Sequence, residues 1–489
     1  MSTSLQGAFV AATTTIPSGL LIGGAWRPAA GGGEIPVLDP ATGEPIGAVA
    51  DATVDDARAA VDAAEAAAPG WAATPPRERA EVLRGAFELM RAREEEIAAT
   101  ITAEMGKPLA EARGEAAYAA EFLRWFAEEA VRAEGEYAIA PGGAARVLVL
   151  PQPVGISLLV TPWNFPAAMA TRKLGPALAA GCTAIVKPAT ETPLTTLLIA
   201  RMLEEAGAPP GVVGVLTTSR PGEVVAEMVG DPRVRKLSFT GSTEVGRRLL
   251  ALAARSVVNV SMELGGNAPF LVLEDADVDA AVAGALAAKL RNGGEACTAA
   301  NRFLVHESVA EAFTDGLTAA MAAVRMAPGT EPGAELGPMI NEAAVAKIEA
   351  LVADACEHGA RVRTGGARPD GPGWFYPATV LDRVAPGSAI LREEVFGPVA
   401  PVLTFADEAE AIAVANDTEH GLVAYVFSRD LRRAMRVAES IETGMVGLNR
   451  GVVSDPAAPF GGVKQSGIGR EGGHHGLREF LEPKYFSFD

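Results

Sequence analysis

The sequence predicts an α/β protein of more than one domain, built around a doubly wound parallel sheet. Three observations lead to this class. The chain has 489 residues, which is too long for one hydrophobic core and fits two or three domains. Helical periodicity dominates residues 54–133, and short apolar runs alternate with helical stretches from residue 155 onward. Such alternation is typical of parallel strands joined by helices, with ligands at the carboxyl ends of the strands.

The first part of the chain is predicted to form a helical layer. In the stretch TPPRERAEVLRGAFELM, Thr74 is expected to cap a helix that has prolines in its first turn. Leu83, Ala86, Phe87 and Met90 then follow at the i, i+3, i+4 and i+7 positions. This spacing places the four side chains on one face of a helix, which should pack against the core.

Apolar runs from residue 155 onward predict the strands of the sheet. The expected strands are GISLLV, TAIV, VVGVL, VRKLSF and VVNVSMEL, and the helices between them cover 167–181, 193–207, 222–229 and 246–255. A further run, NAPFLVL, and a helix with Val278, Val282 and Leu286 begin more α/β alternation, which continues to about residue 450. The segments APGGAARVLVLPQPVG and KYFSFD are expected to form a hairpin and a terminal strand, and either could pair with another subunit.

Composition argues against several classes of protein. The formal net charge of −19 argues against nucleic acid as a partner, because phosphate binding needs a basic field. No apolar run is long enough to cross a bilayer, and the first cationic side chain is Arg27, so a cytoplasmic protein is expected. Cys182, Cys297 and Cys356 are scattered without a C-x-x-C pair, which argues against a disulfide framework and a metal site.

Polar or reactive residues follow the predicted strands where they end. Trp163 and Asn164 follow the first strand, Lys187 ends the second, and Glu263 ends the last strand ahead of two glycines. Because the carboxyl ends of parallel strands meet at one edge of a sheet, we expect these side chains to converge on one crevice.

Two glycine-containing loops complete the predicted crevice. FTGSTEVG places Gly241 and Gly246 in a strand, turn and helix, which lets a diphosphate approach backbone N–H groups at a helix N-terminus. RNGGEACTAANRF places Cys297 in a loop of small residues after a predicted helix. Taken singly, such a turn is more often a tight connection, and a lone cysteine is more often a packing residue. Their joint presence on one side of the sheet favours a catalytic site.

Seven motifs in order resemble those of the aldehyde dehydrogenase superfamily, from about residue 20 to the C-terminus. They are VTPWNFP, VKPATETP, FTGSTEVG, MELGGN, GGEACTAANRF, EEVFGPV and PFGGVKQSGIGREGG. The resemblance implies an NAD(P)-binding domain, an α/β catalytic domain and a β-strand oligomerisation arm, assembled as a homodimer or homotetramer. The implied division is a flexible tail over 1–20, the NAD(P)-binding domain over 21–135 and 156–265, the catalytic domain over 266–450, and the arm with the C-terminal segment over 136–155 and 451–489.

The resemblance also implies the catalytic residues. Cys297 matches the nucleophile, Glu263 the general base, and Asn164 with the backbone N–H of Cys297 the oxyanion hole. A thiolate suits this chemistry, because it is the strongest side-chain nucleophile near neutral pH and forms a thioester once hydride has left. Hydrolysis of the thioester then needs a carboxylate that activates water.

Cofactor residues follow from the same match. The implied set is Trp163, Lys187, Thr190, Gly241, Ser242, Gly246, Leu264, Glu394 and Phe396. Lys187 corresponds to a ligand of the adenosine ribose, Ser242 to one of the diphosphate, and Glu394 to one of the nicotinamide ribose. Many NAD-preferring relatives carry Glu where this chain has Thr190, so nothing here would exclude a 2′-phosphate. We therefore expect NADP as the cofactor, with NAD as the alternative.

Within the superfamily, the motifs are most similar to those of succinate-semialdehyde dehydrogenases. Arg172, Arg291 and Ser454 match the residues that hold the distal carboxylate there, and the arginine fork suits a carboxylate. The alternative is that Arg291 is a helix-end cation and Arg172 a surface residue. Glu295 replaces a glutamine that is common in relatives, and its charge could raise the pKa of the Cys297 thiol.

Three other functions compete with oxidation of succinate semialdehyde. Glutarate semialdehyde is the nearest alternative substrate with the same chemistry. A non-catalytic dinucleotide-binding or structural protein is the alternative of another class, although such a role would not require Cys297, Glu263 and Asn164 together. A coenzyme A-dependent thioester transfer fits less well, because the hydrolytic base Glu263 is present.

Overall fold

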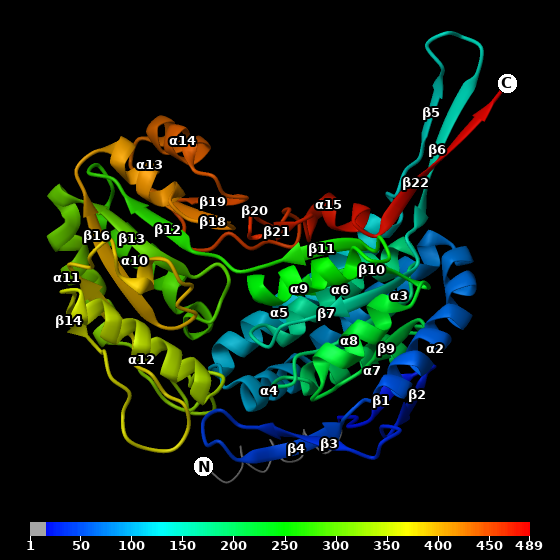
Figure 1. Ribbon diagram of the computed structural model, residues 1–489, viewed down its shortest axis with the longest axis horizontal. Helices are drawn as coiled ribbons and strands as arrows, with labels where there is room; N and C mark the ends of the chain where they lie inside the picture. Colours follow the sequence, from blue (N-terminus) through cyan, green and yellow to red (C-terminus); the bar gives the residue numbers. More distant parts are fainter. Residues whose placement is uncertain (1–15) are drawn as a thin grey trace.

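The computed structural model describes residues 16–489, which form two α/β units side by side and an arm that projects from one of them (Figure 1). The predicted α/β fold with a doubly wound sheet is therefore confirmed. Within the described residues, no helix is long and apolar enough to cross a membrane.

The first unit is centred on an eight-stranded sheet with the order β2-β1-β9-β8-β7-β10-β11-β21. Its strands are β1 (Leu20–Ile22), β2 (Ala25–Arg27), β7 (Ile156–Val160), β8 (Ala184–Lys187), β9 (Val213–Val215), β10 (Val234–Thr240), β11 (Asn259–Glu263) and β21 (Gly467–Ile468). The five central strands are parallel, and all five were predicted. The winding direction reverses between β7 and β10, which opens a crevice at the carboxyl ends of these two strands.

Helices cover both faces of this sheet. They are α2 (Val54–Ala73), α3 (Pro76–Ala92), α4 (Glu94–Met105), α5 (Leu109–Ala130), α6 (Pro166–Ala180), α7 (Leu194–Glu205), α8 (Pro221–Gly230) and α9 (Thr243–Ala253). One face carries α2, α8 and α9, whereas α6 and α7 cover the other beneath a layer of α3, α4 and α5. Leu83, Ala86 and Met90 of α3 are buried as predicted, while Phe87 is partly buried.

The predicted cap of α3 is wrong. Thr74 follows the last residue of α2, and α3 is preceded by Pro75, which provides no side-chain hydrogen bond. Pro76 occupies the first helical position, where its fixed φ suits the helix and its missing N–H removes one donor that would lack a partner. The two prolines therefore start this helix without a capping hydroxyl.

The second unit contains a seven-stranded sheet with the order β14-β15-β16-β13-β12-β18-β19, parallel except for β14. Its strands are β12 (Ala268–Val272), β13 (Ala300–His306), β14 (Arg361–Thr364), β15 (Thr379–Asp382), β16 (Val399–Phe405), β18 (Val423–Phe427) and β19 (Met445–Leu448). Its helices are α10 (Val278–Leu290), α11 (Glu307–Ala322), α12 (Glu342–Glu357), α13 (Glu408–Asn416) and α14 (Leu431–Ser440). The connection from β11 to β12 joins the two sheets and carries the two glycines that follow Glu263.

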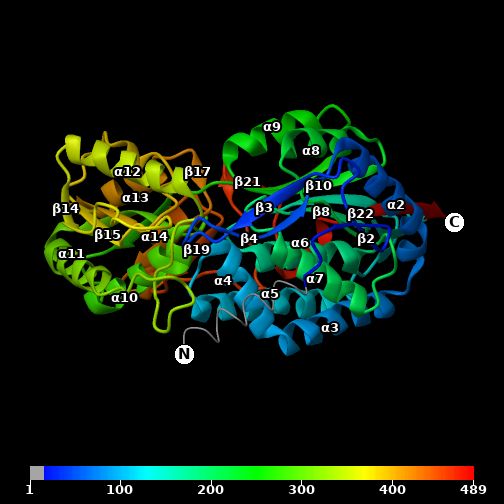
Figure 2. The same cartoon turned by 90° about the horizontal axis from the view of Figure 1, so that it is seen from below.

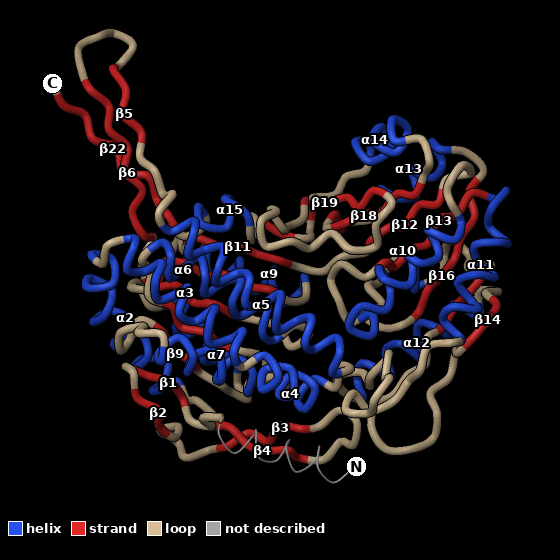
Figure 3. The backbone as a smooth tube through the Cα atoms, turned by 180° about the vertical axis from the view of Figure 1, so that it is seen from behind, coloured by secondary structure: helices blue, strands red, loops and turns tan. Residues whose placement is uncertain are grey.

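The arm is a three-stranded antiparallel sheet of β5 (Glu136–Ile139), β6 (Arg146–Pro153) and β22 (Leu481–Phe488). The predicted hairpin and terminal strand are thus both present, and they pair with each other within one chain. Figure 3 shows the arm extending away from both units. Large apolar side chains of the arm remain exposed, namely those of Tyr137, Ile139, Tyr485, Phe486 and Phe488.

Smaller elements correct the expected boundaries. The tail predicted over residues 1–20 is too long, because Ile16 is buried and Leu20 begins β1; its residues 1–15 lie outside the described part. In the segment 451–489, β20 (Val463–Lys464) pairs with β17 (His420–Gly421), β21 joins the first sheet, and α15 (Gly473–Arg478) packs on α5 and α6. Figure 2 shows the hairpin of β3 (Glu34–Leu38) and β4 (Pro45–Ala50) running across the underside of the molecule.

Candidate active site

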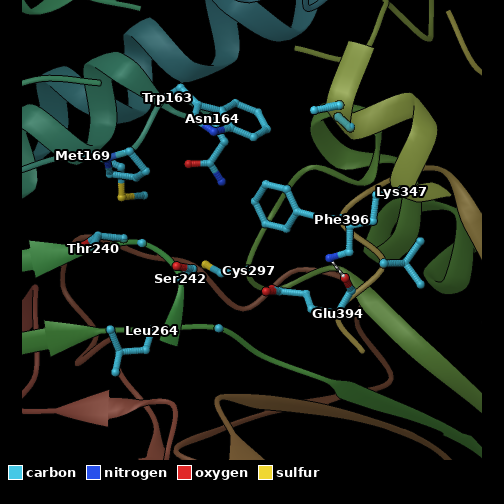
Figure 4. A pocket seen from close by; sticks show the side chains of 16 residues that line it. Trp163, Asn164, Met169, Thr240, Ser242, Leu264, Cys297, Lys347, Glu394 and Phe396 are labelled. Carbon is cyan, nitrogen blue, oxygen red and sulfur yellow. Dashed lines mark hydrogen bonds between the residues drawn. The ribbon is translucent and has the colours of Figure 1, made fainter. Parts of the chain in front are cut away.

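A cavity of about 350 Å³ lies between the two units at the carboxyl ends of β7 and β10. The side chains labelled in Figure 4 line it: Trp163, Asn164, Met169, Thr240, Ser242, Leu264, Cys297, Lys347, Glu394 and Phe396. The predicted convergence of loops from separate strands on one crevice is therefore present.

Cys297 lies in the loop between α10 and β13, and a left-handed turn brings it to the cavity. Asn292 and the two glycines after it have φ values of 54°, 62° and 80°. The Asn292 side-chain amide donates to Asn164 O at 3.0 Å and to Glu295 O at 2.9 Å. A non-glycine residue in this region costs roughly 1–3 kcal/mol and persists only where its surroundings hold it. The two hydrogen bonds supply that constraint.

Burial raises the pKa of the Cys297 thiol to about 12. Arg172 opposes this shift most strongly and Arg291 to a lesser degree, whereas Glu394 and Glu263 add to it. The thiol in this structure is therefore protonated at neutral pH, and its reaction as a nucleophile requires a base.

Glu263 ends β11 and is 3% exposed. Neither of its carboxylate oxygens has a hydrogen-bond partner among the described residues. Burial raises the pKa of this carboxyl well above its usual value, and the nearby Glu471 raises it further, while Lys173 and Arg172 oppose the shift. A carboxyl that is unpartnered and has a raised pKa is suited to accept a proton near neutral pH.

The two glycines after Glu263 allow three parts of the chain to meet. A Cβ at Gly266 would lie 2.8 Å from Cys297 O, and a Cβ at Gly265 would lie 3.0 Å from Glu394 Oε2. Any larger residue would push the nucleophile loop or the Glu394 loop away. The glycine pair in MELGGN therefore serves close approach at the site.

Asn164 is 4% exposed and reaches the cavity beside Cys297 (Figure 4). Its Nδ2 donates to Glu295 O at 3.0 Å, and its backbone carbonyl accepts from Lys107 Nζ at 3.0 Å. Because an amide nitrogen carries two hydrogens, one remains for a substrate oxygen. This geometry is compatible with the predicted oxyanion hole.

Six of the nine residues matched to the cofactor line the cavity: Trp163, Gly241, Ser242, Leu264, Glu394 and Phe396. The rings of Trp163 and Phe396 meet edge to face, with centroids 5.4 Å apart. Ser242 is the N-cap of α9, as its side chain accepts a hydrogen bond from Val245 N. Glu394 Oε1 accepts from Gly266 N at 3.2 Å.

The other three of the nine lie outside the cavity wall. Lys187 ends β8 beside the end of β7, and its burial lowers the pKa of the amine to about 8. The Thr190 hydroxyl donates to Thr218 O at 3.1 Å. Gly246 is buried, and a Cβ there would lie 2.4 Å from Leu264 Cδ2. Because Gly246 has no side chain, α9 can pack on Leu264. The position of Gly246 therefore indicates a role in packing, whereas the sequence predicted a role in admitting a diphosphate.

The three residues matched to the substrate carboxylate form one cluster around Tyr118. Arg291 Nη1 donates to Ser454 Oγ at 3.3 Å, and its guanidinium lies 5.7 Å from the centre of the Tyr118 ring. Arg172 Nη2 donates to Tyr118 Oη at 2.7 Å, and its Nη1 lies 3.7 Å from Glu471 Oε2. Arg172 is 2% exposed, so the alternative that it is a surface residue is wrong.

Sequence reasoning missed Tyr118 and Glu471. Tyr118 lies four residues before Phe122 on α5, and this spacing is also that of an ordinary core pair, so the sequence gave no separate signal. Glu471 stands inside the motif PFGGVKQSGIGREGG, but nothing in its position indicated that it would pair with Lys173 and Arg172. Only the docking of the C-terminal segment on α6 brings these charges together.

The structure does not support the predicted effect of the Glu295 charge on the pKa of the Cys297 thiol. Its carboxyl is turned to Ile340 N, with Oε1 accepting a hydrogen bond at 3.0 Å. The charged groups that act most on Cys297 are the two arginines and two glutamates named above.

Comparison with known proteins agrees with this fold and site. The model of the aldehyde dehydrogenase family matches residues 26–486, and the chain belongs to this family of oxidoreductases. It is 58% identical over 437 residues to a succinate-semialdehyde dehydrogenase of Paenarthrobacter nicotinovorans, covering 89% of this chain and 97% of that protein. It is 50% identical to a glutarate-semialdehyde dehydrogenase of Pseudomonas aeruginosa, covering 95% and 96% of the two chains.

The same relationship is evident among solved structures. The crystal structure of an NADP-dependent enzyme from E. coli superimposes with a TM-score of 0.95 at 48% identity, covering 97% of this chain and 98% of that chain. The sequence-based assignment to the family and to its fold is therefore confirmed.

Proposed function

We propose that the protein oxidises succinate semialdehyde to succinate, with NADP as the hydride acceptor. The observation that carries the proposal is that Cys297 and Asn164 line one cavity, while Glu263 and the Arg291 that pairs with Ser454 both act on the pKa of the Cys297 thiol. The name of the Paenarthrobacter relative, which shares 58% of its residues with this chain, supports the choice of substrate.

The wall of the cavity suits a nicotinamide dinucleotide. Ser242 at the N-terminus of α9 would hold the diphosphate, Glu394 the nicotinamide ribose, and Trp163 and Phe396 would flank the reactive end. Gly265 also lines the cavity, and a Cβ there would lie 3.0 Å from Glu394 Oε2. When bound, the dinucleotide accepts the hydride that leaves the substrate carbon.

Each residue then has one task in the reaction. The Cys297 thiol gives its proton to solvent water, and the resulting thiolate forms a bond to the aldehyde carbon. The oxyanion receives hydrogen bonds from Asn164 Nδ2 and the Cys297 N–H. Departure of hydride converts this thiohemiacetal into a thioester. Glu263 takes a proton from water, whose oxygen attacks the thioester carbon, and succinate leaves as the thiol is restored.

Arg291→Ala should lower kcat/KM for succinate semialdehyde about 10- to 150-fold, because a charge-assisted hydrogen bond to the carboxylate contributes roughly 1.5–3 kcal/mol. A chain with a net charge of −19 attracts an anionic aldehyde only through such local cations. The measurement is steady-state kinetics with succinate semialdehyde and with butanal, which has no carboxylate.

Arg291→Ala should lower kcat/KM far less for butanal than for succinate semialdehyde. Tyr118→Phe is the matched variant of the same cluster, because it keeps the ring beside Arg291 and removes only the hydroxyl that Arg172 contacts. Equal losses of kcat/KM on both aldehydes in Arg291→Ala would show that the arginine has a structural role. The protein would then be an aldehyde dehydrogenase of other specificity.

Glutarate semialdehyde is the second candidate substrate, and the Pseudomonas aeruginosa relative at 50% identity favours it. Its carboxylate lies one methylene farther from the aldehyde, so the same arginines would hold it at a different depth. A higher kcat/KM for glutarate semialdehyde than for succinate semialdehyde would replace the first proposal with this one.

Thr190→Glu should shift cofactor preference from NADP towards NAD. Thr190 follows the ribose ligand matched by Lys187, and a carboxylate there would repel a 2′-phosphate by roughly 1–4 kcal/mol. We expect the NADP to NAD ratio of kcat/KM to fall at least about fivefold. Thr190→Gln is the control of equal size without charge, and an unchanged ratio in Thr190→Glu would place Thr190 away from the ribose.

The proposal includes a homodimer or homotetramer in the cytoplasm. Its support is the arm, which projects beyond the body of the molecule (Figure 1) and leaves large apolar side chains exposed, among them Tyr137, Ile139, Tyr485, Phe486 and Phe488. Exposed apolar surface of this kind is typical of a contact between proteins, and a second copy of the chain offers the symmetric partner.

A further inference from the structure

We propose that Glu295 is a positioning residue that acts as a neutral carboxylic acid, and that its ionisation at alkaline pH lowers turnover. The proposal rests on aldehyde oxidation at Cys297, but it does not depend on which aldehyde is oxidised. Among the described residues, the Glu295 carboxyl makes no hydrogen bond to Cys297 or to Glu263, and Glu295 acts through the residues that it holds in place.

The side chain of Glu295 ties the nucleophile loop to the opposite wall of the cavity. Glu295 is fully buried, and its Oε1 accepts from Ile340 N at 3.0 Å. Ile340 stands directly before Asn341, the N-cap of α12, and α12 carries Lys347 on the cavity wall. Lys347 Nζ in turn donates to Glu394 O at 2.6 Å. The carboxyl therefore fixes the start of the helix that supports the cofactor-side wall.

The backbone of the same residue holds the amide expected to bind the oxyanion. Glu295 O accepts from Asn164 Nδ2 at 3.0 Å and from Asn292 Nδ2 at 2.9 Å. These bonds lie two residues before Cys297. A displacement of Glu295 therefore moves Asn164, the left-handed turn at Asn292 and the nucleophile together.

The surroundings of the carboxyl favour its neutral form. Oε2 has no hydrogen-bond partner among the described residues, so an anion there would be supported by one backbone N–H and by the charge of Lys107. A buried carboxylate with so little support is disfavoured relative to the acid. Consistent with this, burial raises the pKa of Glu295 to about 8, against the opposing effects of Ile340 N and Lys107.

The charged groups around Glu295 are already engaged with one another. Lys107 donates to Glu115 and to Asn164 O, and Glu111 on α5 accepts from Asn292 N. The segment before α12 that faces the carboxyl, residues 337–341, contains no titratable side chain. On its own loop, Arg291 is directed to Ser454. Among the described residues, Lys107 is the cation that lowers the pKa of Glu295, and it is already paired with Glu115.

Ionisation would disturb the site through the residues that Glu295 holds. The anion would draw toward N–H donors and so change the position of Asn164, whose Nδ2 donates to Glu295 O. As the pH rises, turnover of the wild type should therefore fall relative to that of a protein that cannot ionise at this position.

The test compares kcat across about pH 6 to 10 for the wild-type protein and Glu295→Gln. Glutamine has the same shape, can accept from Ile340 N through its Oε1 and does not ionise. We expect the ratio of wild-type to variant kcat to be constant at low pH and to fall towards tenfold per pH unit well above pH ~8. A ratio of wild-type to variant kcat that stays constant across the whole pH range would overturn the proposal.

Glu104→Gln is the matched control. Glu104 is equally buried, its pKa is also raised to about 8 by burial, and it accepts from Leu194 N and Thr195 N away from the nucleophile loop. The ratio of wild-type to Glu104→Gln kcat should stay constant across the same pH range. A ratio that falls above pH ~8 for Glu104→Gln would assign the titration to Glu104 and refute the role of Glu295.

A second measurement separates this proposal from the proposed function. The infrared C=O band of a protonated carboxyl should be present in wild type near neutral pH, disappear at alkaline pH and be reduced in Glu295→Gln. This readout needs no turnover. If the protein did not oxidise aldehydes, the proposed function would be refuted, but the infrared band could still be measured. Identical bands in wild type and Glu295→Gln at neutral pH would show that Glu295 is ionised there and overturn the inference.

Discussion

Cys297→Ala is expected to lower kcat for aldehyde oxidation by roughly 10⁴-fold or more, because the covalent bond to the substrate can no longer form. Cofactor affinity should change little, since the residues matched to the dinucleotide lie on other loops. Steady-state kinetics gives the loss of turnover, and quenching of tryptophan fluorescence on titration with NADP gives the affinity. Trp163 on the cavity wall provides the signal.

Cys356→Ala is the matched control, because Cys356 is exposed on α12 and faces no part of the cavity. Its turnover should stay within about twofold of wild type, as is usual for surface substitutions. Wild-type turnover in Cys297→Ala would show that another group attacks the aldehyde and would remove the basis of the proposed mechanism.

Glu263→Gln should lower steady-state turnover roughly 10²- to 10⁴-fold while leaving one rapid hydride transfer per site. The reason is that the base activates water only after the thioester has formed. Rapid mixing of enzyme, cofactor and aldehyde should therefore show a burst of reduced cofactor followed by slow hydrolysis.

The absence of a burst would show that Glu263 acts before hydride transfer. In that outcome the carboxylate removes the proton of Cys297 before attack. The electrostatic effect of Glu263 on this thiol is consistent with the two groups lying near each other. Activity of the wild type should rise with pH in either case, because the raised pKa of Glu263 shifts its conversion to the basic carboxylate to higher pH than for an ordinary glutamate.

The positions of the main site residues could be predicted because each follows directly from a strand. Asn164 comes after β7, Ser242 after β10, and Glu263 ends β11. Parallel strands present their carboxyl ends at one edge, so apolar runs in the sequence were sufficient to bring these side chains together. Cys297 could be added because its loop lies between a predicted helix and a strand of the second unit.

Contacts between segments far apart in the chain could not be predicted in this way. Arg172 on α6 meets Tyr118 on α5 and Glu471 in the C-terminal segment, and no local pattern states which pairs will touch. Gly246 illustrates the opposite case, since its spacing from Gly241 suggested a phosphate loop and its real neighbour is the side chain of Leu264.

The sequence by itself determined the α/β class, the order of strands and helices, the family and the residues at the strand ends, because hydrophobic periodicity and short motifs are local properties of the chain. Only the tertiary structure decided the ionisation of those residues and the orientation of their side chains. Glu295 shows the difference: its position two residues before Cys297 suggested that its charge could raise the pKa of the thiol, but the sequence did not state where the side chain points. Folding instead buries the carboxyl against Ile340 N, where desolvation favours the acid. Burial and the direction of a side chain are set by every neighbour at once, and those neighbours come from elements that lie far apart along the chain.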